Sequence, residues 1–315
     1  MKISRREFIA GLVAAGASVP IAGIAKSVGK RQVDNGKICI FSKHLQWLDY
    51  QGMAETAAQI GFDGVDLTVR PRGHVLPERA EDDLPKAVEA VNKAGLKVYM
   101  ITTAIRDPND VHTDRILRTA SQLGIKYYRL GYLKYDDSLG IERSLEAHKA
   151  TLSELGKLNK LYRIHGAYQN HAGTGVGGPV WDIWYLIKDL NPKWIGCQYD
   201  IKHATHEGGR SWPLGLKLLK KYIKITAIKD FKWVKEDGKW RGQHVPLSEG
   251  MVDFVAYFKL AKQLDISGPI SMHFEYPLGG ADKGKSKLSI DGTKVLGAMR
   301  NDLKILRGWV HEFLL

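Results

Sequence analysis

Two patterns of apolar and polar positions alternate along the chain from residue 37 onward. Short runs rich in β-branched and aromatic residues, such as "KICIFSK" and "KVYMITT", are typical of buried strands. Longer stretches such as "LPKAVEAVNKAG" carry apolar residues at spacings of three and four, which indicates amphipathic helices. A helix is expected after every strand, the last at 294–315, and the strands are predicted at 37–43, 64–70, 97–103, 127–133, 163–171, 195–203, 223–230 and 269–275. This alternation predicts an α/β fold of the closed (β/α)8 type, the TIM-barrel architecture, rather than an open sheet.

The N-terminal stretch follows neither pattern. Arg5 and Arg6 stand together, Phe8 follows, and an apolar run leads to a small-x-small site at Gly23 and Ala25. These features are typical of a twin-arginine export signal, which predicts a periplasmic protein, with a membrane-retained anchor as the alternative. The predicted organisation is a signal over 1–25, a polar linker over 26–36 and one barrel domain over 37–315.

Composition and charge narrow the set of partners. With 315 residues and 44% hydrophobic content, the chain is long enough to bury a large core. Cys39 and Cys197 lie in separate predicted strands and are expected to be buried thiols rather than a disulfide framework. The formal net charge of +13 comes from scattered lysines without a basic run between aromatics. A solvated basic surface is therefore expected, with no nucleic-acid partner and membrane contact only through the export signal.

Polar side chains close the predicted strands, where the functional sites of such barrels lie. Asp200 and Glu275 end otherwise apolar runs, and a carboxylate buried there needs a cation or hydrogen-bond donors nearby. A solvated polar rim is the alternative interpretation. The strand-end groups are Lys43, Asp66, Arg70, Thr102, Arg129, Gln169, His171, Asp200, His203, Lys229, His273 and Glu275.

Six short motifs resemble one known family. They are "GFDGVDLTVR", "YQNHAG", "YDIKHA", "YIKITAIKD", "VPLSEGMVDF" and "MHFEY", and the likeness covers nearly all of the chain after the linker. The family is that of the xylose isomerase-like sugar phosphate isomerase/epimerase barrels, which share their fold with AP endonuclease family 2. The resemblance implies an enzyme that moves a proton next to a sugar carbonyl through an enediolate, assisted by a divalent cation. A small-molecule carbohydrate is the expected partner.

The resemblance also implies a metal site, with two of its four ligands changed. Members of the family hold the cation with Glu, Asp, His and Glu at the ends of strands five to eight. The matching residues are Gln169, Asp200, Ala227 and Glu275, so one carboxylate and one imidazole are lost. A manganese, magnesium or zinc ion on Gln169, Asp200 and Glu275 is one expectation. Two others stay open: nitrogen ligands from His171, His203, His206 or His273, or no metal and a fixed positive charge from Lys229 or Arg70.

The strand-end positions and these matches together predict the remaining roles. Catalysis is expected of Glu275, Lys229 and His203, and substrate binding of Lys43, Arg70, His74, Arg129 and His171. For Arg70, a structural ion pair with Asp66 or Glu78 is an equal alternative. His206 follows His203 by three residues, but the glycines at 208 and 209 argue against a helix there, so a role in the site is favoured for His203 over His206.

Because a glutamine cannot accept a proton, Gln169 disfavours two-base epimerisation and favours one-base isomerisation or β-elimination around Glu275. The prediction is an exported carbohydrate isomerase or epimerase-like enzyme. The alternatives are a lyase acting on keto-sugars or keto-glycosides by β-elimination, and a sugar-binding barrel without catalysis. A nuclease is disfavoured because the histidine-rich pattern of a three-metal site is not visible.

Overall fold

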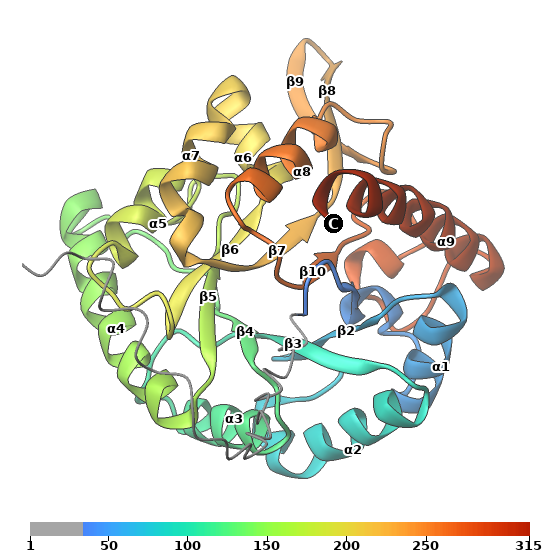
Figure 1. Ribbon diagram of the computed structural model, residues 1–315, viewed down its shortest axis with the longest axis horizontal. Coiled ribbons are helices and arrows are strands. Elements are labelled where there is room, and N and C mark those ends of the chain that lie inside the picture. The colour runs from blue at the N-terminus through green and yellow to red at the C-terminus, as the bar shows by residue number, and fades with distance from the viewer. Residues whose placement is uncertain (1–33) are drawn as a thin grey trace, which may run out of the picture. The chain divides into compact units, whose positions relative to one another are not determined.

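Eight parallel strands form a closed barrel in the computed structural model, which describes residues 34–315 (Figure 1). The order around the barrel is β1–β10–β7–β6–β5–β4–β3–β2, so the first strand pairs with the last. The predicted (β/α)8 fold is confirmed. The strands are β1 (Ile38–Phe41), β2 (Gly64–Val69), β3 (Lys97–Thr103), β4 (Tyr127–Arg129), β5 (His165–Gln169), β6 (Ile195–Asp200), β7 (Ile223–Ile228) and β10 (Ile270–Met272).

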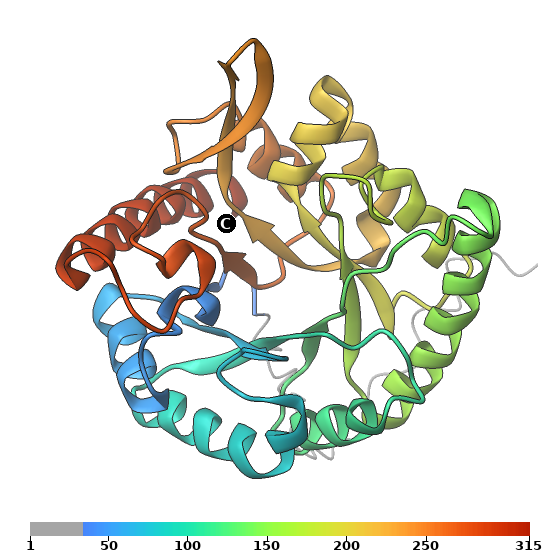
Figure 2. The same cartoon turned by 180° about the vertical axis from the view of Figure 1, so that it is seen from behind.

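Helices surround this barrel and cover the outer face of its strands (Figures 1 and 2). They are α1 (Tyr50–Ile60), α2 (Ala80–Lys93), α3 (Val111–Gln122), α4 (Gly140–Tyr162), α5 (Val180–Ile187), α6 (Ile201–Gly208), α7 (Trp212–Leu219), α8 (Phe254–Gln263) and α9 (Gly292–Trp309). A π-helix over Val310–Leu314 continues α9. Within residues 34–315, no helix combines the length and the apolar character that crossing a membrane requires.

The predicted export signal and most of the predicted linker lie outside the described residues. The compact unit begins at Asp34, three residues before the predicted start of the barrel domain. Lys126 Nζ lies 2.9 Å from Asp34 Oδ2, and the Gly36 N–H donates to the Ser267 carbonyl at 3.0 Å. These contacts attach the last linker residues, 34–36, to the barrel.

The interior of the barrel contains a small apolar cluster of its own, separate from the main core between strands and helices. It consists of Cys39, Met100, Ala167 and Ile225. Both cysteines, Cys39 and Cys197, are buried and free, as predicted. Because side chains alternate along a strand, the residues two and four positions after these interior residues also point inward, at the carboxyl end of the barrel. This parity places Gln169 after Ala167, and Lys229 after Ile225.

A two-stranded antiparallel hairpin, not predicted from the pattern, follows β7 and projects from the rim (Figures 1 and 2). It comprises β8 (Asp230–Glu236) and β9 (Lys239–Val245), joined by Asp237 and Gly238 with φ of 50° and 75°. At its base, the buried Asp230 carboxylate accepts hydrogen bonds from the backbone N–H groups of Phe231 and Gly250. The close approach requires Gly250, since a Cβ there would lie 2.0 Å from Asp230 Oδ1. The base of the hairpin is thus fixed against the rim.

Candidate active site

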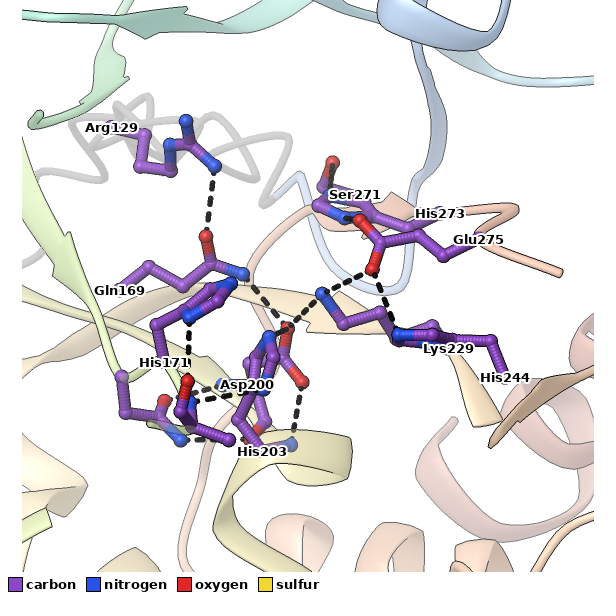
Figure 3. Close-up of polar contacts among 12 residues, drawn as sticks. Arg129, Gln169, His171, Asp200, His203, Lys229, His244, Ser271, His273 and Glu275 are labelled. Carbon is purple, nitrogen blue, oxygen red and sulfur yellow. Dashed lines mark hydrogen bonds and ion pairs between the residues drawn. The ribbon is translucent and has the colours of Figure 1, made fainter. Parts of the chain in front are cut away.

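A lysine ammonium group occupies the centre of the site, between two carboxylates (Figure 3). Lys229 Nζ lies 3.2 Å from Asp200 Oδ2 and 3.4 Å from Glu275 Oε2. Its side chain is 3% exposed, so the whole length of the lysine is enclosed by the barrel. Burial alone would lower the pKa of Lys229, but Asp200 and Glu275 more than offset burial and raise it, which keeps the ammonium charged.

Glu275 is the member of this cluster that solvent reaches, with a side chain that is 21% exposed. Lys43 Nζ lies 3.3 Å from Oε1, while His273 Nδ1 and His244 Nε2 lie 3.8 and 3.7 Å from the carboxylate. Burial raises the pKa of Glu275, but the nearby Lys229 and Lys43 ammonium groups hold it well below its usual range. The carboxylate is therefore ionised in the resting site.

Asp200 is fully buried and accepts hydrogen bonds on both of its oxygens. It ends β6 and caps α6, where Oδ1 accepts from the His203 N–H at 3.1 Å, and Oδ2 accepts from Gln169 Nε2 at 2.8 Å. The cap starts a helix over Ile201–Gly208, so the expectation that the glycines prevent a helix is wrong: Gly208 and Gly209 end it instead.

His206 lies on that helix but apart from the cluster. Its Nδ1 is 3.1 Å from Glu207, and its ring packs 4.4 Å from the ring of Trp233. The structure thus separates the two histidines that stand three apart in the sequence. His203 contacts Asp200, whereas His206 packs beneath the hairpin.

Gln169 is held by hydrogen bonds at both ends of its amide (Figure 3). Its Oε1 accepts from Arg129 Nη1 at 2.9 Å and from the Tyr132 hydroxyl at 2.7 Å. The amide nitrogen consequently faces Asp200, to which it donates. Arg129, predicted to bind substrate, thus orients Gln169 as well as lining the site.

His171 and His203 pack together, with ring centroids 4.0 Å apart. The Nδ1 of His203 accepts a hydrogen bond from the Ala172 N–H at 3.1 Å, and burial holds the His203 pKa well below its usual range. The neutral ring therefore carries its proton on Nε2, which lies 3.7 Å from Asp200 Oδ2. His171 is half-buried beside His203 and Asp200, and its ring centroid lies 4.8 Å from that of Tyr132.

The two predicted binding residues that follow β2 differ in placement. The Arg70 guanidinium lies 5.3 Å from the centre of the Phe41 ring and makes no ion pair within residues 34–315, so the alternative pairs with Asp66 and Glu78 do not form. Burial lowers its pKa to about 10. His74 instead lies against Thr68, with Nδ1 at 3.4 Å from the hydroxyl oxygen.

The sequence interpretation missed three residues around the cluster. His244 comes from the unpredicted hairpin, and burial lowers its pKa to about 4. Tyr132 follows β4 and contacts Gln169. Lys202 follows Asp200 by two residues and lies 5.0 Å from the centre of the Phe231 ring; burial, followed by the positive charge of Lys229, lowers its pKa to about 8. Its place two residues after a strand-end aspartate was the visible signal for Lys202.

The residues present do not fit the divalent cation that the family resemblance implies. Within residues 34–315, no group of three or more His, Cys, Asp or Glu side chains is arranged to hold a metal ion. Gln169 turns its nitrogen, not its oxygen, toward Asp200. Ala227, which pairs with Asp200 across β6 and β7, offers no ligand, and the space between the two carboxylates holds Lys229.

Sequence comparison decides the family. Residues 54–294 match the family described as xylose isomerase-like TIM barrel. The chain belongs to this family. The predicted family resemblance is thereby confirmed, and the match runs from within α1 to the start of α9. A search of curated proteins gives no match.

Solved structures of this xylose isomerase-like fold share the architecture at low sequence identity. D-psicose 3-epimerase from Clostridium cellulolyticum, solved with D-tagatose, has a TM-score of 0.65 at 11% identity over 87% of this chain and 98% of its own. The 3-keto-D-glucoside 4-epimerase of E. coli has a TM-score of 0.61 at 14% identity, over 86% and 99%. The IOLI protein with a bound zinc atom has a TM-score of 0.66 at 17% identity, over 86% and 97%. At these identities the likeness concerns the fold.

Proposed function

We propose that the protein is an exported carbohydrate isomerase or epimerase-like enzyme that transfers a proton next to a sugar carbonyl. The family and the fold shared with two sugar epimerases support this substrate class. The observation that carries the proposal is Glu275, a partly exposed carboxylate at the carboxyl end of the barrel, held between two lysine ammonium groups. The twin arginines, Arg5 and Arg6, support export, which favours free or glycosidic sugars over sugar phosphates.

The chemistry follows from how charge moves during such a step. Glu275 takes the proton from the carbon next to the carbonyl, and the electron pair left behind forms an enediolate whose charge lies on the former carbonyl oxygen. Lys43 and Lys229, which balance the Glu275 carboxylate in the resting site, then balance this oxygen. The total charge of the site is unchanged, so little reorganisation is needed.

The state of Gln169 favours reactions that use one base. Its amide is neutral and fully engaged with Arg129, Tyr132 and Asp200, so it neither accepts a proton nor turns to do so. Isomerisation by return of the proton to the neighbouring carbon, or β-elimination from a keto-glycoside, needs only Glu275. The elimination is the second candidate, supported by the same absence of a basic atom at Gln169.

The test is proton exchange on a panel of keto-sugars and keto-glycosides in heavy water. We expect deuterium to enter the carbon next to the carbonyl, and Glu275→Gln to lower its rate by about 10²-fold or more. Glu89→Gln, on the exposed face of α2, is the matched control and should leave the rate unchanged. Sugar binding by calorimetry without any exchange would favour a sugar-binding barrel instead.

A further inference from the structure

The carboxylates at the carboxyl end of the barrel are already neutralised by the protein itself. Lys229 Nζ contacts both Asp200 and Glu275, and Lys43 Nζ adds a second positive charge 3.3 Å from Glu275. Two ammonium groups therefore face two carboxylates. A divalent ion placed among them would add two positive charges without a counter-charge, next to an ammonium buried in the same space.

The groups within hydrogen-bond distance of the Asp200 carboxylate itself are donors. Gln169 Nε2 and the His203 N–H donate to the carboxylate, and the protonated Nε2 of His203 faces it at 3.7 Å. The Asn170 amide oxygen is engaged with the Asp200 N–H at 2.7 Å. The surroundings of Asp200 thus supply hydrogen atoms where a metal site supplies lone pairs.

We propose that the Lys229 ammonium is a resident cation that takes the place of a divalent metal in this site. The catalytic role of Lys229 rests on the proposed function, whereas its position between Asp200 and Glu275 rests on geometry alone. In the reaction, the C–H bond breaks, its proton goes to the Glu275 carboxylate, and its electron pair moves into the enediolate. The Lys229 N–H groups then donate hydrogen bonds to the new oxyanion, and the ammonium keeps all of its protons.

This assignment separates Lys229 from a merely structural lysine. Lys229→Met should remove the charge and one oxyanion donor, which lowers kcat by about 10²- to 10³-fold with a much smaller change in KM. Lys229→Arg keeps the charge and should recover part of kcat. A variant that folds like the wild type by circular dichroism but loses only substrate affinity would contradict the catalytic role.

The direct test of placement is metal binding by the full-length protein purified after export, measured with manganese alone by calorimetry and by elemental analysis. We expect less than stoichiometric metal in the wild type, and no saturable manganese binding. The pair of substitutions Gln169→Glu and Ala227→His should still bind weakly, because Lys229 stays in place. Adding Lys229→Ala to that pair should increase affinity by at least about 100-fold, since a carboxylate, an imidazole and free space then complete the ligand set.

Two results would overturn the inference. One is wild-type protein with stoichiometric metal that a chelator removes; the other is equal, tight manganese binding by the double and triple variants. If the triple variant does not fold, the metal contents of the wild type and of Lys229→Met are compared instead. Less than stoichiometric metal in the wild type supports the inference, and stoichiometric metal that a chelator removes contradicts it. Because these measurements need no substrate, they stand even if no sugar on the panel reacts, so failure of the proposed function is told apart from failure of this inference.

Discussion

Gln169→Glu tests the polarity of the site, because it changes one buried donor into an acceptor at nearly constant shape. In the native protein, Gln169 Nε2 donates to Asp200 Oδ2 at 2.8 Å, and both residues are almost fully buried. The introduced carboxylate would keep the bonds from Arg129 and Tyr132 but would face Asp200 with an oxygen. A hydrogen bond becomes a contact between like charges.

The magnitude follows from the lost bond. Hydrogen bonds to charged groups contribute about 1.5–3 kcal/mol, so we expect a loss of about 2 kcal/mol or more in unfolding free energy at neutral pH. The like charge of Asp200 raises the pKa of the introduced carboxyl above its unfolded value of about 4.3. A raised pKa means that the protonated form, which can again donate to Asp200, is favoured in the folded state. The loss relative to wild type should therefore be smallest below about pH 4.3 and grow as pH rises through the folded pKa.

The assay is urea unfolding of wild type and variant across pH, with stability compared at each pH so that other titrations cancel. Asp200→Asn supplies the matched background, because its amide could donate to the introduced carboxylate. In that background Gln169→Glu should cost at least about 1.5 kcal/mol less than in the wild type. Equal losses of unfolding free energy in the two backgrounds would contradict the assignment of the Gln169 amide nitrogen as the atom that faces Asp200. Rescue by manganese while Lys229 is present would refute it as well.

Three further predictions concern other parts of the protein. Burial lowers the pKa of His165 to about 4, against about 6.5 in the unfolded chain. The free energy of unfolding should therefore fall by roughly 3 kcal/mol as pH drops from about 6.5 to about 4. In urea unfolding, the midpoint should fall less over this pH range in His165→Gln than in the wild type. Arg70→Met should raise KM by about tenfold (~1.4 kcal/mol) with little change in kcat, because Arg70 makes no ion pair within residues 34–315; an unchanged KM would remove it from the site. Replacing Arg5 and Arg6 with lysine should hold the protein in the cytoplasm, and unchanged periplasmic recovery after cell fractionation would show another route.

The barrel could be predicted because its strands are short apolar runs with regular spacing. The β8–β9 hairpin was missed because charged residues interrupt both of its strands, as in "FKWVKEDGKWRGQHV", so neither strand is a short apolar run. The signal was present in the Asp237-Gly238 pair, which is typical of a two-residue hairpin turn. Helix α6 was misjudged because Asp200 was treated only as a site residue and not as a helix cap.

For the candidate site, strand parity indicates which residues point inward but not which of them touch. Lys229 and Gln169 could be placed at strand ends from the sequence. That the lysine reaches between Asp200 and Glu275, and that the glutamine presents its nitrogen, depends on distances between strands and on Arg129 and Tyr132 holding the amide oxygen. Side-chain polarity of this kind is set by tertiary contacts.

Deuterium incorporation by the full-length wild-type protein in heavy water containing excess EDTA tests the central claim most directly, with a keto-sugar that the protein binds. We expect one deuterium at the carbon next to the carbonyl, at the same rate with and without the chelator. We also expect this incorporation to fall by about 10²-fold or more in both Glu275→Gln and Lys229→Met. Incorporation that stops on chelation and returns with manganese, or that survives both substitutions, would contradict the claim.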